Sequence, residues 1–161
     1  MINPHRRRWL NLLLVAVVVF LMIILGLRVA VGQTCARIGA WYHQREWTAK
    51  QLNNYRYIAR ISCFCGEEVT EPILVEVHNG TLASIIYING KSPVTITSFN
   101  ELRTIEDVFD IIRNATQEGA DHISVTYDAT YGFPSEIHID YRFNTIDDEI
   151  SYSIKQFEVL K

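Results

Sequence analysis

The sequence predicts an α+β protein in which one N-terminal transmembrane helix precedes a small globular domain. Residues 12–27 form an uncharged apolar run, and the rest of the chain alternates one helix-like segment with three strand-like segments, twice over. This order predicts an antiparallel sheet of about six strands with two helices on one face. The same order also fits two helix-plus-three-strand repeats, although the residue identities of the two halves do not match.

The apolar segment, residues 9–31, is long enough to span a membrane. At about 1.5 Å per residue it covers the roughly 30 Å hydrocarbon core with some tilt. Trp9 suits the headgroup layer, and the positive-inside rule places the basic tail, residues 1–8, in the cytosol. We therefore expect a single-pass cell-membrane protein with an extracytoplasmic domain over residues 36–161. The basic residues that set this orientation are Arg6, Arg7 and Arg8.

Two other fates of the N-terminal segment remain open. A cleaved signal peptide shares the basic start, but its apolar region is usually about 7–15 residues long, and this one is longer. Lipidation at Cys35 would require small residues before the cysteine, and Gln33 and Thr34 are a poor match. The segment is therefore expected to stay attached as an anchor.

Charge excludes one class of partner. All 18 acidic residues lie in residues 36–161, which hold eleven of the 15 basic ones, so this domain carries a formal charge of −7. Affinity for nucleic acid depends on lysine and arginine neutralising phosphates, so a nucleic-acid partner is not expected. No glycine-rich or proline-rich linker divides residues 36–161, and their number suits one domain with its own core.

The domain is expected to begin with a helix over residues 37–53, which is followed by strands. The helix shows a stripe at helical spacing that comprises Ile38, Trp41, Tyr42, Arg45, Ala49 and Leu52. The predicted strands cover residues 55–63, 73–78, 82–88, 122–127, 135–143 and 150–159, with a short edge segment at 93–98. Asn79 and Gly80 between the second and third of these favour a two-residue hairpin turn.

A second helix is predicted from Thr104 to Gly119. Thr104 is a good N-cap, and Asp107 three residues later completes a capping-box-like pair. Gly119 is well placed to end the helix. The expected buried stripe comprises Ile105, Val108, Phe109 and Ile112, whereas Glu106 is expected on the surface, where its loss would cost well under about 1 kcal/mol.

Five acidic residues in the last third of the domain are the candidate metal ligands. They are Asp128, Asp140, Asp147, Asp148 and Glu149, all at predicted strand ends or turns. If their loops meet, three of them could bind Ca²⁺, which takes six to eight oxygen ligands. Their spacing matches no calcium-binding loop, and aspartate is common in turns because it caps the local backbone. Structural turns are therefore the main expectation, with Ca²⁺ as the alternative.

The sequence contains no recognisable catalytic constellation. No nucleophile elbow, phosphate-binding loop, dinucleotide fingerprint or zinc signature occurs. The histidines are scattered, with no pair at the spacing of metal ligands. We therefore do not expect an enzyme.

Cys63 and Cys65 are candidates for a disulfide. A regular strand would place their Cα atoms nearly 7 Å apart, roughly at the upper limit of disulfide geometry. Gly66 favours a bend that would bring them closer, and an extracytoplasmic compartment favours oxidation. Free thiols, or a thiol site for a soft metal such as Cu(I), remain the alternatives.

The order of certain residues resembles that of an uncharacterised bacterial domain family over about residues 41–158. These residues are Trp47, Tyr55, Tyr57, Cys63, Cys65, Pro72, Glu76, Asn79, Gly80, Thr104, Ile105, Phe109, Tyr127, Asp128, Gly132, Pro134, Ile137, Ile139, Asp140, Asp147, Asp148 and Glu149. Members of that family are lipoproteins or membrane-anchored extracytoplasmic proteins. The resemblance implies a cell-envelope location and transfers no catalytic residue. The chain departs from the lipoprotein members because it lacks a proper lipidation box.

Two hypotheses for function follow. The first is a membrane-anchored binding or interaction module that uses its sheet or loops to contact a small ligand or another envelope protein. The alternative is a metal- or thiol-dependent accessory protein built on the acidic residues or on Cys63 and Cys65.

The predicted orientation can be tested with a reporter fused after Lys161. The reporter should be active only outside the cytosol, because the basic tail keeps residue 1 inside. Replacing Arg6, Arg7 and Arg8 by glutamate should weaken that orientation, whereas a cytosolic C-terminus in the unaltered chain would contradict it. Mass spectrometry of the mature protein should find residues 1–31 still attached.

Overall fold

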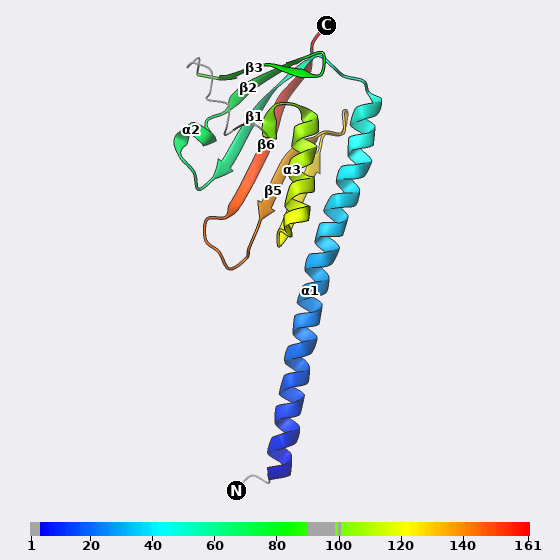
Figure 1. Cartoon of the computed structure of the whole chain (residues 1–161), viewed down its shortest axis with the longest axis vertical. Helices are drawn as coiled ribbons and strands as arrows, with labels where there is room; N and C mark the ends of the chain where they lie inside the picture. Colours follow the sequence, from blue (N-terminus) through cyan, green and yellow to red (C-terminus); the bar gives the residue numbers. More distant parts are fainter. Residues whose placement is uncertain (1–3, 90–98, 100) are drawn as a thin grey trace.

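The computed structural model describes residues 4–89, 99 and 101–161, which form one long helix beside a curved sheet (Figure 1). The elements are α1 Pro4–Ala49, β1 Tyr55–Cys63, α2 Glu67–Thr70, β2 Ile73–His78, β3 Thr81–Tyr87, α3 Ile105–Glu118, β4 His122–Tyr127, β5 Pro134–Asp140 and β6 Glu149–Val159. This confirms the predicted α+β class, with an N-terminal apolar helix and a six-stranded antiparallel sheet. The two-unit repeat is not shown, and the expected edge segment at 93–98 lies outside the described residues.

The apolar helix continues into the domain without a break. We expected a membrane segment over residues 9–31 and a separate helix over 37–53, but α1 is a single helix of 46 residues. At 1.5 Å per residue it is about 69 Å long. It ends at Ala49, and Gln51 just beyond adopts a left-handed φ of 53°. The globular domain is therefore attached to a rigid extension of the apolar segment.

Small residues line the side of α1 that packs against the domain. Ala40 is buried and Ala36 partly buried, while a Cβ atom added at Gly39 would lie 3.5 Å from the Tyr127 hydroxyl. Two helical turns further on, Trp47 is only 2% exposed. The small residues let α1 approach β4 closely, and Trp47 fills the wider space beyond them.

The predicted apolar stripe on this helix was wrong. Ile38, Trp41 and Tyr42 are 61%, 58% and 54% exposed, so they lie on the outer side of α1. The prediction weighted large apolar side chains, whereas close contact between a helix and a sheet favours small ones. Among the residues of the expected stripe, all of which the structure describes, Leu52 is the one that packs against the hydrophobic core.

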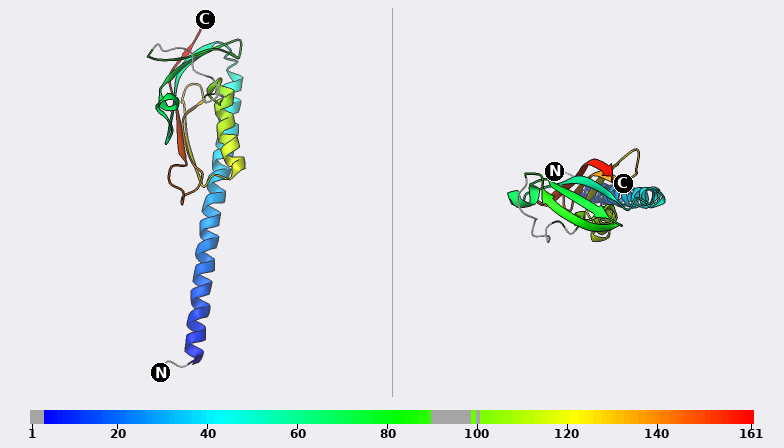
Figure 2. Two further views of the ribbon diagram at one scale, coloured as in Figure 1. Left: turned by 60° about the vertical axis from the view of Figure 1, so that its left-hand side comes forward. Right: turned by 90° about the horizontal axis from the view of Figure 1, so that it is seen from above.

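The strands lie in the order β3-β2-β1-β6-β5-β4, and every neighbouring pair is antiparallel. Along β1 the burial alternates, so that Tyr55, Tyr57, Ala59 and Ile61 face inward. The C-terminal part of α1 lies beside α3, and both cover the same face of the sheet (Figure 2). Both of these helices therefore lie on one face of the sheet, as predicted.

The capping of α3 is as predicted. Thr104 Oγ1 accepts a hydrogen bond from the Asp107 amide at 3.2 Å and donates one to Asp107 Oδ2 at 2.8 Å. Gly119 ends the helix in the left-handed region, with φ at 80°. Ile105, Val108, Phe109 and Ile112 are buried, as are Ile111 and Ala115.

Glu106 connects three elements, which the sequence did not predict. Its Oε1 accepts a hydrogen bond of 2.8 Å from Trp47 Nε1 on α1, and its Oε2 accepts one of 3.4 Å from the Tyr55 hydroxyl on β1. The same hydroxyl accepts from the Ile105 amide at 3.1 Å, so β1 also caps α3. Burial raises the pKa of Tyr55 well above its ordinary value. Glu106 is exposed, as expected, but its hydrogen bonds to Trp47 and Tyr55 were not foreseen.

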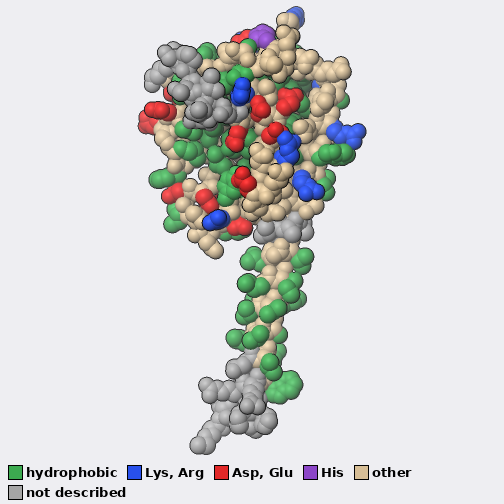
Figure 3. All heavy atoms as spheres, viewed as in Figure 1, with side chains coloured by type: hydrophobic (Ala, Val, Ile, Leu, Met, Phe, Trp, Pro, Cys, Tyr) green, Lys and Arg blue, Asp and Glu red, His purple; other side chains and the backbone are tan. Residues whose placement is uncertain are grey.

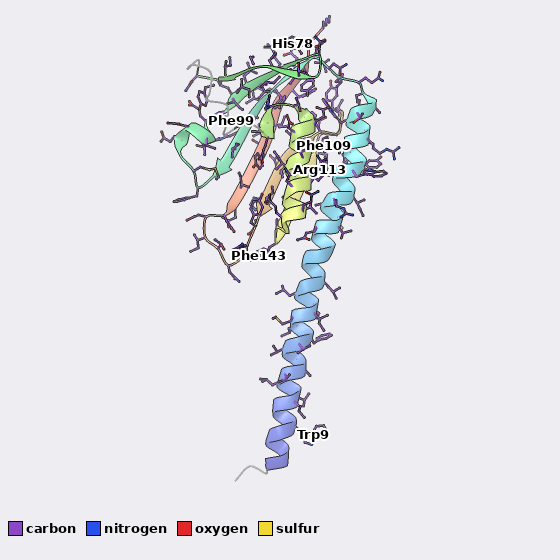
Figure 4. All side chains as sticks on the ribbon, viewed as in Figure 1. Trp9, His78, Phe99, Phe109, Arg113 and Phe143 are labelled. Atoms are coloured by element: carbon purple, nitrogen blue, oxygen red, sulfur yellow. A yellow bond between two sulfur atoms is a disulfide. The ribbon has the colours of Figure 1, made fainter. Side chains whose placement is uncertain are left out.

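Urea unfolding of three alanine variants tests this packing. Phe109→Ala should cost about 3–5 kcal/mol, because the side chain is fully buried and would leave a cavity (Figure 4). Glu106→Ala should cost about 1–3 kcal/mol, because it leaves the buried Trp47 indole without its acceptor. Exposed Asn114→Ala on the same helix is the control, with a change within about 0.5 kcal/mol. Equal effects of all three would contradict the position of α3.

Candidate functional site

The uncovered face of the sheet carries two rows of polar side chains that cross four strands. One row, ordered from β1 through β6 and β5 to β4, contains Ser62, Ser151, His138 and Ser124. The adjacent row contains Arg60, Ser153, Glu136 and Thr126. Residues directly opposite each other on neighbouring strands lie close enough for their side chains to interact. The register therefore gathers hydroxyl groups in the middle of the face.

These rows form an open hollow of about 410 Å³, which we call the serine hollow. Its floor consists of short hydroxyl side chains, whereas strands generally favour branched or aromatic residues. Longer side chains surround the floor: Arg60 on β1, Lys155 on β6, and Glu136 and His138 on β5. Its volume is in the range typical of sites for small ligands.

Hydrogen bonds hold two side chains of the serine hollow in place. His138 Nδ1 lies 2.9 Å from Ser151 Oγ across the β5–β6 pair. Arg60 Nε donates to the Thr70 carbonyl at 3.2 Å, which directs the guanidinium toward the α2 side of the hollow. Hydroxyl groups both donate and accept hydrogen bonds, and arginine and lysine bind carboxylate or phosphate oxygens. The arrangement can thus bind a polar ligand that carries an acidic group.

The structure does not bring the five acidic candidates together. Asp140 and Glu149 are direct partners across β5 and β6. Asp128 follows β4 at its other end, six residues beyond His122, the partner of Asp140, and therefore about 20 Å along the extended strand. Its Oδ1 accepts from the Thr130 and Tyr131 amides at 2.9 and 2.7 Å, which is the turn-capping role expected of aspartate.

The rest of this acidic set shows no metal centre either. Asp147 adopts a left-handed φ of 74° in the connection before β6, and Asp148 follows it. Across the part of the chain that the structure describes, no group of three or more histidine, cysteine, aspartate or glutamate residues is arranged to hold a metal ion. The Ca²⁺ alternative gains no support from this geometry.

A histidine pair was missed by the sequence reasoning. His122 on β4 and His138 on β5 have ring centroids 6.2 Å apart at the edge of the serine hollow. We treated the histidines as scattered because they are sixteen positions apart along the chain. The sequence could have indicated this pair, since both histidines occupy outward positions on two strands that are joined by one hairpin.

Cys63 and Cys65 are brought together as the sequence indicated. Their Cα atoms are 5.2 Å apart, within the range of disulfides, and their sulfur atoms are in contact. The chain bends at this point before Gly66, so the nearly 7 Å separation of a regular strand does not apply. Cys35 on α1 is exposed. The disulfide itself remains a prediction.

An apolar groove lies on the outer side of the two helices. It measures about 530 Å³ and is formed by residues of α1, among them Ile38 and Trp41, and of α3, among them Phe109 and Arg113 (Figure 4). The Arg45 guanidinium lies 4.8 Å from the ring centre of Trp41 and covers part of that ring. The groove is lined by the large side chains that α1 turns away from the sheet.

The N-terminal part of α1 is apolar and exposed. Trp9 is 69% exposed near the start of the helix (Figure 4). The segment Leu12–Ala49 contains a window of mean hydropathy 3.0, long and apolar enough to cross a membrane by length and composition. Below the domain apolar side chains are visible along both edges of the helix (Figure 3), and residues 12–27 are all exposed. This pattern is typical of a helix surrounded by lipid.

Comparison with known proteins identifies the domain. Residues 42–159 match the family of unknown function DUF6174. The chain belongs to this family. The matched region starts within α1 and includes every strand of the sheet, so a DUF6174 domain comprises the sheet, α3 and the last two turns of α1. No curated protein and no solved structure matches the chain.

DUF6174 membership confirms the resemblance to an uncharacterised family seen in the sequence. The family description assigns no activity, so the match identifies the domain and leaves its role to the geometry. Bacterial origin, lipidation of relatives and the residue pattern given for the resemblance remain predictions.

Thiol counting tests the cysteine pair. Protein purified without reductant should show a single reactive thiol, at Cys35, of the three cysteines in the chain. Replacing Cys63 and Cys65 together by serine should lower stability only modestly, because closing so small a loop removes little unfolded-state entropy. Three reactive thiols would show that the pair is reduced. A bridge from Cys35 to either partner would refute the pairing.

Proposed function

We propose that this DUF6174 protein is a membrane-anchored, extracytoplasmic binding module of the cell envelope. In this proposal α1 spans the cell membrane, the basic tail stays in the cytosol, and the domain binds its ligand in the serine hollow. The ligand is a small polar molecule that carries a carboxylate or phosphate group. The proposed role is binding, because the hollow offers hydrogen-bonding hydroxyl groups and two cations.

The observation that carries this proposal is the placement of Arg60 and Lys155 above a floor of hydroxyl groups. The hollow is lined by these two cations and one carboxylate, Glu136, whereas the domain as a whole carries −7. A negatively charged group of a ligand would be attracted to the two cations. Charge-assisted hydrogen bonds from the two cations would supply affinity, and the serines would supply orientation.

Glu136 and His138 add selectivity to the same hollow. Glu136 lies between Ser153 and Thr126 in its row, so a fully anionic surface of a ligand would be repelled at this point. A ligand with one acidic group near Arg60 and hydroxyl or amide groups near Glu136 fits better. We therefore favour a molecule of mixed polarity over a simple anion.

Titration calorimetry on the full chain in detergent micelles tests the proposal, with gluconate, which has one carboxylate and several hydroxyl groups, as the anionic probe and glycerol as the neutral one. Gluconate should bind and glycerol should not. Arg60→Gln should weaken gluconate binding by about tenfold or more, the loss expected for one charge-assisted hydrogen bond. Added salt should weaken binding as well.

Matched serine variants provide the control. Ser153→Leu should abolish binding because it fills the floor of the serine hollow. Ser84→Leu makes the same change on β3, outside the hollow, and should leave binding unchanged. Absence of gluconate binding, or equal losses in both variants, would contradict the proposed site.

A further inference from the structure

The connection between β5 and β6, residues 141–148, displays two exposed apolar side chains. Phe143 is 60% exposed and Ile146 is 87% exposed. Single exposed apolar residues are ordinary on protein surfaces and need no explanation by themselves. These two side chains are unusual because of where the loop lies. It lies at the end of the domain nearest the apolar part of α1, with Phe143 on that side (Figure 4).

Hydrogen bonds tie the loop to a definite height on α1. Gln33 Nε2 donates to the Ala120 carbonyl at 2.8 Å, so the turn between α3 and β4 is held at the level of Gln33. The next residue, Asp121, accepts from the Phe143 amide at 3.0 Å through Oδ2, and its own amide donates to the Tyr141 carbonyl at 3.4 Å. The base of the loop is therefore fixed beside Gln33.

That height corresponds to the surface of a bilayer. The apolar segment, residues 9–31 of α1, is about 34 Å long and spans the roughly 30 Å hydrocarbon core with some tilt. Gln33 is two residues further along, about 3 Å beyond, and therefore lies within the headgroup layer, which is roughly 5–8 Å thick on each side. Because the helix is unbroken, no hinge can lift the domain away from this level. The loop extends from its base back toward the apolar segment (Figure 1).

We propose that Phe143 and Ile146 insert into the headgroup layer of the leaflet on the domain side, so that loop 141–148 is a second membrane contact. This inference rests on the anchoring of α1 in the proposed function. Aromatic and aliphatic side chains at the boundary between headgroups and acyl chains stabilise such contacts. The loop carries Arg142 but also Asp147 and Asp148, so insertion depends on apolar contact and not on anionic lipid.

A fluorescent label between the two apolar residues tests the contact. The full chain, with Cys35→Ser and Asn144→Cys, is labelled with an environment-sensitive dye and placed in phosphatidylcholine nanodiscs. Emission should shift to the blue, and lipids with a nitroxide near the headgroup should quench it at least twofold more than a label at Ala129→Cys. Ala129 is exposed in the turn between β4 and β5, at the other end of the sheet. The Cys35→Ser chain without a new cysteine measures background labelling.

The double variant Phe143→Ser, Ile146→Ser separates this proposal from the anchor. In that chain the Asn144→Cys label should lose both the shift and the quenching, while the protein stays in the nanodisc. Water-like emission in the chain that keeps both apolar residues, with the protein still in the disc, would overturn the loop contact alone. Release of every variant from the discs would instead overturn the anchor. A signal that appears only with anionic lipid would overturn the apolar mechanism.

Discussion

The Glu106 carboxylate determines how the three parts of the domain fit together. Its two oxygens bind the Trp47 indole of α1 and the Tyr55 hydroxyl of β1, while the residue itself belongs to the first turn of α3. A buried indole N–H needs an acceptor, and a buried tyrosine hydroxyl needs a partner as well. The carboxylate satisfies both at once. The rotation of α1 about its own axis follows, because only one orientation brings Trp47 to this acceptor.

Once that rotation is fixed, the two sides of α1 take different roles. The side toward β4 must be small, and Gly39 and Ala40 lie there, against Tyr127. Burial in this tight seam raises the pKa of Tyr127 to about 12, and its ring stacks on His43 with the centroids 3.9 Å apart. The large side chains, Ile38 and Trp41, are left on the outer side and line the apolar groove.

The sequence predicted the strands more reliably than it predicted the helices. Alternation in β1 and the Asn79-Gly80 turn depend on neighbours in the chain, and both matched the structure. So did the Thr104 cap, which is also local. The packed side of α1 depends on how close a distant strand lies, and the role of Glu106 depends on residues about fifty positions away.

The candidate site was predicted less well, for the same physical reason. Serine carries little pattern information, so Ser62, Ser151 and Ser124 drew no attention until the register placed them in one row. The acidic candidates shared a residue type and nearby positions in sequence. Antiparallel pairing nevertheless sends Asp128 to the opposite end of the strands from Asp140. A cysteine pair two residues apart is local, and it was found.

Because α1 is unbroken, the number of residues in it sets the orientation of the domain about the helix axis. Each residue of an α-helix turns the chain by about 100°. Inserting or deleting one residue between the membrane segment and Gln33 would therefore swing the whole sheet about the helix axis by more than a quarter-turn. The serine hollow would then point in a different direction about the axis of α1, although every contact inside the domain would be unchanged. The number of residues in the apolar helix therefore sets the direction in which the serine hollow faces.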